Sequence, residues 1–163
     1  MADTQTYDQS HLRISPLDEV DPTELRDFLV STQKSFWGAR DLTEDLDAYW
    51  VRQLGGSGLV ARYQNEIVGY LLGVIPINGP AYIHLVAARD DFRHHGVGRQ
   101  LYNRFIDDAK GLGKDEVQAT AFQDNVGAIS FHTSVGFEGE LIANYAGQGI
   151  PRVLFTLGLN KDS

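Results

Sequence analysis

The sequence predicts an α/β or α+β fold built on a mixed sheet. Two observations support this prediction. Apolar residues recur at helical spacing in the first third of the chain, and from Gly58 onward most of them alternate or run together as they do in strands. The expected order is one strand, two helices, three strands, a helix, a strand, a helix and two strands. A length of 163 residues suits one domain with its own core.

The first ten residues are polar and are expected to form a flexible tail before a single domain over residues 11–163. The segment "LRISPL" predicts a first strand. A helix is expected to begin at Pro22 behind a cap at Asp21, because proline fits the first helical turn. A second helix is expected within "SFWGARDLTEDLDAYWVRQL", where apolar residues return at helical spacing.

Strand patterns dominate the second half of the chain. The runs "GLVARYQ" and "EIVGYLLGVIPI" predict a hairpin turning at "NE", and a helix is expected from about Gly96 to Lys110. The remaining expected segments are the strands "AYIHLVAA", "EVQATAF", "GELIANY" and "RVLFTLGL" and the short helix "VGAISFHTSV".

Composition excludes several functions. The net charge of −8 argues against nucleic acid as a partner, because phosphate backbones are bound by clustered cations. The chain has no cysteine, so it can form no disulfide, thiolate zinc site or cysteine nucleophile. No segment is apolar enough to span a membrane, and no signal-peptide pattern opens the sequence. We therefore expect a cytoplasmic protein without a membrane or nucleic-acid partner.

A glycine-rich stretch precedes the helix expected from Gly96. This stretch follows a predicted strand and contains Arg93, Gly96 and Gly98. The first N–H groups of a helix have no partners within the helix and can bind phosphate, provided that no side chain keeps the phosphate away, and glycine has no side chain. The alternative is a strand-to-helix turn that binds nothing. A dinucleotide fingerprint is excluded because Leu101 stands where its third glycine belongs, and no Gly-Lys-Ser/Thr sequence supports a Walker loop.

The spacing of Arg93, Gly96 and Gly98 resembles the Q/R-x-x-G-x-G/A signature of the GCN5-related N-acetyltransferase (GNAT) superfamily. A second element, "DNVGAISFHTSVGFE", resembles the family's downstream pattern N-x-x-A-x-x-F-Y-x-x-x-G-F. The resemblance extends from about Gly58 to Leu159. It implies an acetyltransferase with a V-shaped cofactor cleft between "AYIHLVAA" and "EVQATAF".

The resemblance also implies where acetyl-CoA, the expected co-substrate, would bind. Its pantetheine would pair with a strand, its pyrophosphate would meet main-chain N–H groups of the loop, and its arm would pass the second motif. The corresponding positions are Leu85, Val86, Ala87 and Ala88 on the strand, Arg93, His94, His95, Gly96, Val97, Gly98 and Arg99 in the loop, and Asn125, Ala128 and Phe131 in the second motif.

Three side chains are candidates for proton transfer. His84 stands where relatives carry a glutamate base, and the alternative is a histidine satisfied by a neighbouring element. His132 replaces the family's tyrosine acid. It is expected either to protonate the thiolate or to pack against the cofactor arm, leaving protonation to water. Tyr145 is a second candidate donor, with a half-buried strand tyrosine as its alternative. No metal site is expected, because the adjacent His94 and His95 cannot converge on one ion.

The function expected from these features is direct acetyl transfer to an amine, which is either a small molecule or a peptide or protein amine. The alternative is a non-catalytic acyl-CoA-binding module or sensor. The absence of cysteine excludes an acetyl-cysteine intermediate. Trp37 is the expected acceptor contact. A homodimer through "RVLFTLGL" is a further expectation, because that segment is apolar.

Overall fold

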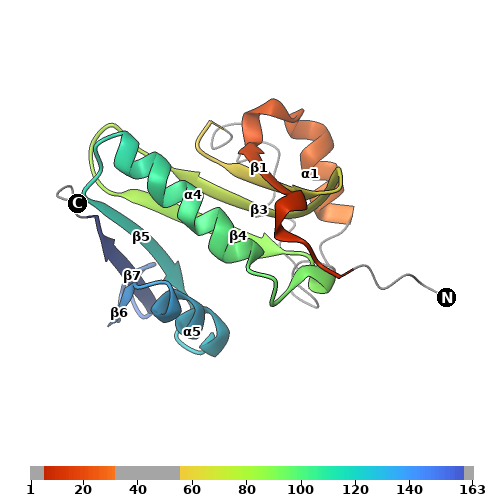
Figure 1. Cartoon of the computed structure of the whole chain (residues 1–163). Coiled ribbons are helices and arrows are strands. Elements are labelled where there is room, and N and C mark those ends of the chain that lie inside the picture. Colours follow the sequence, from red (N-terminus) through yellow and green to blue (C-terminus); the bar gives the residue numbers. More distant parts are fainter. Residues whose placement is uncertain (1–5, 32–55, 160–163) are drawn as a thin grey trace. The chain divides into compact units, whose positions relative to one another are not determined.

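The computed structural model describes residues 6–31 and 56–159. Within these residues seven strands form one sheet in the order β1-β2-β3-β4-β5-β7-β6 (Figure 1). The strands are β1 (Leu12–Pro16), β2 (Leu59–Tyr63), β3 (Glu66–Val74), β4 (Ala81–Ala88), β5 (Glu116–Ala121), β6 (Glu138–Ile142) and β7 (Arg152–Gly158). The helices are α1 (Pro22–Ser31), α4 (Val97–Gly111) and α5 (Val126–Ser134).

This arrangement confirms the predicted mixed sheet with helices, and the described elements follow the predicted order. The second expected helix and Trp37 lie outside the described residues. The segment "GELIANY" is a strand only to Ile142, so the prediction of a strand at Tyr145 was wrong, and Tyr145 lies in the turn that follows β6. Among the described residues, no helix is both long and apolar enough to cross a membrane.

The chain divides into two compact units. The first unit contains Met1–Leu72 and Leu85–Phe105, and the second contains Gly73–His84 and Ile106–Ser163. Strands β3 and β4 and helix α4 therefore contribute residues to both units.

In the first unit, β1, β2 and β3 form an antiparallel ladder. Gln64 and Asn65 connect β2 to β3, and both have positive φ, of 51° and 73°. Two such residues in sequence fit a two-residue hairpin whose twist matches that of the strands. The predicted hairpin is confirmed, with its turn one residue earlier than expected.

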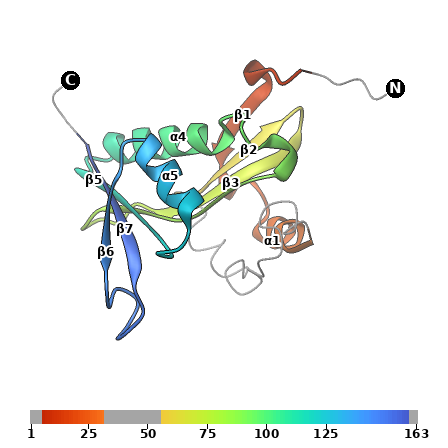
Figure 2. The ribbon, with the colours of Figure 1, turned by 90° about the horizontal axis from the view of Figure 1, so that it is seen from below.

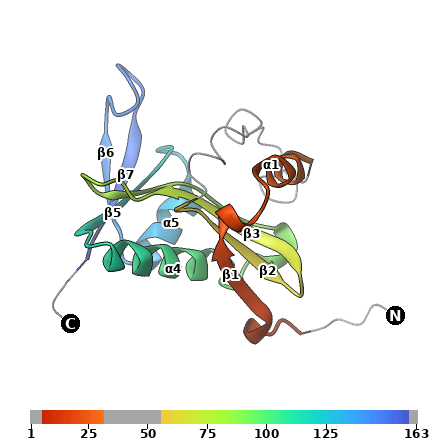
Figure 3. The ribbon, with the colours of Figure 1, turned by 90° about the horizontal axis from the view of Figure 1, so that it is seen from above.

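Helices cover both faces of this ladder (Figures 2 and 3). On one face Leu25 of α1 belongs to a buried cluster with Val60, Tyr70 and Leu72. On the other face α4 comes close to β3 at Gly69, where an added Cβ would lie only 2.7 Å from a methyl carbon of Val97. The small residue on β3 thus lets the start of α4 lie directly on the sheet.

In the second unit, β5 pairs in parallel with β4 over Ala81–Ile83 and antiparallel with β7. The β6–β7 hairpin completes this part of the sheet (Figure 3). Because β7 has β5 on one side and β6 on the other, the segment "RVLFTLGL" is an interior strand with both edges paired. Any pairing between copies at this end of the sheet would use the edge of β6.

Candidate active site

The connection from β4 to α4 carries the predicted phosphate-binding residues. After β4, a short 3-10 turn spans Asp90–Phe92, and four further residues lead into α4. Gly96 has φ of +79°, and a Cβ there would meet nothing within 4 Å, so this side of the loop is open. Gly98 keeps a helical backbone inside α4. Of the two glycines, only Gly96 needs a left-handed backbone.

His94 was not expected to have an unusual conformation, yet its φ is +66°. Left-handed backbone is uncommon for residues with a side chain and costs free energy. Strain of this kind persists only where the surrounding structure holds it, and it is concentrated at functional sites. The loop therefore contains a conformation that its own sequence does not favour.

The backbone N–H groups of this loop are largely unpaired. The N–H of Arg93 donates to the carbonyl of Asp90 (3.3 Å), and the N–H of Gln100, inside α4, donates to the carbonyl of Gly96 (2.9 Å). In the described part of the chain, residues 93–96 form a turn, but none of the N–H groups of residues 94–98 makes a backbone hydrogen bond of good geometry. Helix starts that expose N–H groups in this way bind anions, since the groups and the helix dipole both favour negative charge.

Charged side chains surround the same loop. A guanidinium nitrogen of Arg93 lies 3.0 Å from a carboxylate oxygen of Asp90, and both side chains are about half exposed. Arg89 pairs with Asp91 at 2.7 Å, and this hydrogen bond holds the pKa of Asp91 below its usual value. A phosphate at the loop would have to compete with Asp90 for Arg93. In the residues that the structure covers, no group of three or more His, Asp or Glu side chains is placed to hold a metal ion.

Local hydrogen bonds fix both ends of helix α5. The side-chain oxygen of Asn125 accepts from the N–H of Ala128 (3.0 Å), which is a typical helix cap. At the other end Gly136 has φ of +95°, and the N–H of Phe137 bonds the carbonyl of His132 (2.9 Å).

His132 is buried in an aromatic cluster rather than placed at a surface. Its ring stacks on Phe155 with centroids 4.1 Å apart, and it meets Phe131 and Phe137 edge to face. Nδ1 lies 2.7 Å from the carbonyl of Ala128, an acceptor, so Nδ1 carries the proton. Burial lowers the pKa of His132, and the bond to Ala128 opposes this only in part. These features favour a neutral packing residue over an imidazolium acid.

The candidate base His84 lies on the opposite side of β4 from the buried Ile83. His84 follows Tyr82 by two residues, so both side chains leave the strand on the same side. The hydroxyl of Tyr82 is 2.8 Å from that of Thr120 on β5. Burial raises the pKa of Tyr145, and the nearby Tyr82 raises it further. Sequence reasoning missed Tyr82 and Thr120, although the alternation in "AYIHLVAA" places Tyr82 beside His84.

The strand residues expected beside pantetheine, residues 85–88, come after the part of β4 that pairs with β5. This pairing covers Ala81–Ile83, and β4 continues to Ala88. Leu85 packs against the core of the first unit, and Ala87 is buried. The N–H of Arg89, just beyond the strand, donates to the carbonyl of Val68 (2.8 Å).

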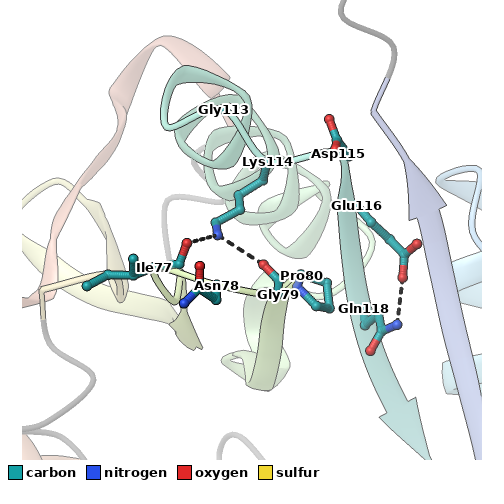
Figure 4. Close-up of a pocket in the computed structure, with 9 residues that line it drawn as sticks. All are labelled: Ile77, Asn78, Gly79, Pro80, Gly113, Lys114, Asp115, Glu116 and Gln118. Atoms are coloured by element: carbon teal, nitrogen blue, oxygen red, sulfur yellow. Dashed lines mark hydrogen bonds between the residues drawn. The ribbon is translucent and has the colours of Figure 1, made fainter.

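A separate pocket of about 370 Å³ lies at the opposite end of β4 (Figure 4). Lys114 lies within it and donates from Nζ to the carbonyls of Ile77 (3.2 Å) and Gly79 (3.0 Å), so it ties the β3–β4 turn to the end of α4. The pocket contains none of the residues predicted from the sequence. It is lined by Ile77, Asn78, Gly79, Pro80, Gly113, Lys114, Asp115, Glu116 and Gln118.

The chain belongs to the acetyltransferase (GNAT) family, which it matches over residues 22–137. An uncharacterized N-acetyltransferase of Methanocaldococcus jannaschii is 33% identical over 99 residues, covering 60% of this chain and 42% of the relative. The L-methionine sulfoximine/L-methionine sulfone acetyltransferase of Salmonella typhimurium is 30% identical over 122 residues, or 71% of each chain. This chain therefore spans less than half of the first relative.

Solved structures share the fold. Ard1 from Thermoplasma volcanium superposes with a TM-score of 0.75 at 20% identity, covering 93% of this chain and 99% of the other. The yncA protein of Salmonella typhimurium, solved with its cofactor acetyl-CoA, gives a TM-score of 0.65 at 20% identity over 94% and 96% of the two chains. The fold expected from the resemblance is confirmed.

The buried, neutral His132 predicts a specific pH dependence of stability. Because its folded pKa lies below the unfolded value of about 6.5, the unfolded state binds more protons as pH falls through this range. The free energy of unfolding should therefore be highest above that value and decline as pH falls toward and through the folded pKa. His132→Phe keeps an aromatic ring against Phe155 and should remove this component.

The measurement is urea unfolding of both proteins at about pH 8 and about pH 5. The wild type should lose more stability than His132→Phe between the two conditions. An equal loss in both proteins would show that His132 is not a buried neutral group.

Proposed function

We propose that this protein is an acetyl-CoA-dependent N-acetyltransferase that transfers the acetyl group directly to an amine. The observation that carries the proposal is the run of N–H groups at residues 94–98 that make no well-formed backbone hydrogen bond within the described residues, beside an open glycine and an arginine. The family membership supports the same reaction class. Acetyl-CoA supplies the activated acetyl group as a thioester.

The loop would hold the pyrophosphate of acetyl-CoA. Gly96 leaves the approach to the backbone free, and Gly98 adds no side chain in the first turn of α4. Arg93 would exchange its bond with Asp90 for a charge-assisted bond to phosphate. We assign the pantetheine amides to the backbone of residues 85–88, in the manner of an added strand. Asn125, Ala128 and Phe131 remain proposals for contact with the cofactor arm.

Direct transfer requires two proton movements. As the amine nitrogen bonds to the acetyl carbon and the carbon–sulfur bond breaks, the nitrogen must lose a proton and the departing thiolate must gain one. We assign the first role to His84, whose imidazole type can accept a proton near neutral pH. We assign the second to Tyr145, whose phenolic hydroxyl carries a proton at neutral pH and whose pKa is raised further by burial and by the nearby Tyr82. His132 is a packing residue in this scheme.

The acceptor is proposed to be the amino group of a small molecule resembling an amino acid. The support is the Salmonella relative, which is named for L-methionine sulfoximine and L-methionine sulfone. A peptide or protein amine is the second candidate, since the net charge of −8 suits cationic acceptors of either size. Contact of Trp37 with the acceptor, a homodimer and a cytoplasmic location remain proposals.

Acetyl-CoA affinity should depend on Gly98. A valine there is compatible with the helical backbone of α4 but would hold phosphate oxygens away from the N–H groups. Losing one or two charge-assisted hydrogen bonds should weaken binding roughly ten- to hundredfold. Isothermal titration calorimetry with acetyl-CoA measures this directly.

Gly158→Val is the matched control, because Gly158 is an exposed strand residue with no atom within 4 Å of an added Cβ. It should bind acetyl-CoA as the wild type does. Unchanged affinity in a folded Gly98→Val protein would contradict the assignment of the loop.

The pH profile of turnover should separate the two candidate acids. If His84 is the base and Tyr145 the acid, kcat should decline at acid pH, where an imidazole base is protonated, and should show no decline at mildly alkaline pH, because the raised pKa of Tyr145 keeps its hydroxyl protonated there. Tyr145→Phe and His84→Gln should each lower kcat roughly a hundredfold or more. Neither variant should change the affinity for acetyl-CoA.

An acid role for His132 predicts a different pH profile. In that case kcat would decline as pH rises above the lowered pKa of His132, and His132→Phe would abolish this decline. Wild-type kcat in both Tyr145→Phe and His84→Gln would remove both assignments and leave proton transfer to water. Tight acetyl-CoA binding without CoA release on a panel of amino acids, polyamines and peptides would favour the non-catalytic sensor.

A further inference from the structure

Tyr7 reaches the loop from a distant part of the chain. Its ring stacks on His95 with centroids 4.4 Å apart and planes inclined by 15°. The ring of Tyr7 also stacks on the ring of Tyr63 in β2, with centroids 5.2 Å apart and planes inclined by 18°. Tyr7 thus joins the N-terminal segment, the β2 end of the sheet and the residue before Gly96, all within the first unit. The flexible tail predicted for the first ten residues does not hold at Tyr7, whose ring is packed.

Further contacts close this group of rings. The centroid of the Phe92 ring lies 6.1 Å from that of Tyr7, 5.1 Å from that of Tyr63 and 6.3 Å from that of His95. The N–H of Asp8 donates to the hydroxyl of Tyr63 (3.0 Å), which fixes the backbone next to Tyr7. We call Tyr7, Tyr63, Phe92 and His95 the ring cluster. Aromatic pairs at such separations attract each other beyond the area that they bury.

The hydroxyl of Tyr7 does not explain this placement. Its oxygen is buried and has no hydrogen-bond partner among the described residues. A buried hydroxyl without a partner is destabilising. The aromatic ring must therefore account for the position of Tyr7, and phenylalanine should serve equally well.

The loop needs support of this kind. Residues 93–96 form a turn, but the N–H groups of residues 94–98 make no backbone hydrogen bond of good geometry to a described acceptor, and His94 is in the left-handed region. On one side Val97 is fully buried against β3 at Gly69. On the side of His95, the loop is held by the packing of the His95 ring against the other members of the ring cluster.

We propose that Tyr7 is a positioning residue that holds the loop in the conformation that binds acetyl-CoA. The proposal rests on the phosphate-binding role given to the loop above. Through its stack on His95, Tyr7 restrains the neighbouring left-handed His94 and keeps the N–H groups of residues 94–98 directed outward before the ligand arrives. Binding then requires less ordering of the loop, which favours affinity.

Three variants of the full chain test the proposal. Tyr7→Ala removes the ring, and Tyr7→Phe removes only the hydroxyl. His11→Ala is the matched control. The His11 ring lies at the edge of the cluster, with its centroid 5.9 Å from that of Tyr63, and its side chain is half exposed. The measurements are the dissociation constant for acetyl-CoA by calorimetry and the amide hydrogen exchange of residues 93–99 in the free protein, well below the melting temperature.

Tyr7→Ala should weaken acetyl-CoA binding roughly 5- to 20-fold and accelerate exchange in the loop, since a poorly populated binding conformation reduces apparent affinity in proportion. It should raise KM for acetyl-CoA more than it lowers kcat. Tyr7→Phe should bind within about twofold of the wild type and raise the melting temperature by about 2 to 4 °C, because the unpartnered hydroxyl is gone. His11→Ala should leave both binding and loop exchange unchanged.

The outcomes distinguish this proposal from the proposed function. If Gly98→Val weakens binding but Tyr7→Ala does not, the loop binds acetyl-CoA and the positioning role of Tyr7 is wrong. If Tyr7→Ala accelerates exchange in the loop while neither variant affects binding, the loop assignment itself fails. Loss of affinity in Tyr7→Phe equal to that in Tyr7→Ala would also overturn the proposal, since the hydroxyl would then be the important group.

Discussion

Unpaired backbone N–H groups at the start of α4 are the constraint on which the account of this protein depends. Polar backbone groups without partners are tolerated only where water or a ligand can reach them. Here the groups of residues 94–98 follow each other in one loop, and an added Cβ at Gly96 would meet open space. The loop is therefore suited to an anion with several oxygens, and a pyrophosphate meets that description.

The rest of the first unit fixes where those groups lie. The close contact of α4 with β3 at Gly69 anchors the helix, and the buried Val97 makes that contact inside the first helical turn. On the other side of the loop the ring cluster holds His95. Arg89 and Arg93 bring positive charge to a chain that is acidic overall, and each is paired with a nearby aspartate. The loop thus combines a fixed backbone with cations that can change partners.

Much of the fold and part of the site could be predicted from the sequence, because those features are written in local patterns. Hydrophobic periodicity gave the order of the described strands and helices, and the glycine spacing placed the loop. The environment of His132 depends on Phe155 and Phe137, which come together with it only in the folded chain. The stack of Tyr7 on His95 joins residues far apart in sequence, and the left-handed His94 has no sequence signal of its own. Local patterns could not predict these features, since tertiary contacts decide them.

The most direct test of the central claim is a backbone amide NMR titration of the free protein. One titration uses acetyl-CoA, and a matched titration uses acetyl-pantetheine, which lacks the diphosphate. With acetyl-CoA the amides of Gly96, Val97 and Gly98 should shift strongly, because each N–H would gain a charged acceptor, and with acetyl-pantetheine they should change little. Saturating acetyl-CoA binding that leaves these amides unmoved, or that moves them no more than acetyl-pantetheine does, would contradict the account.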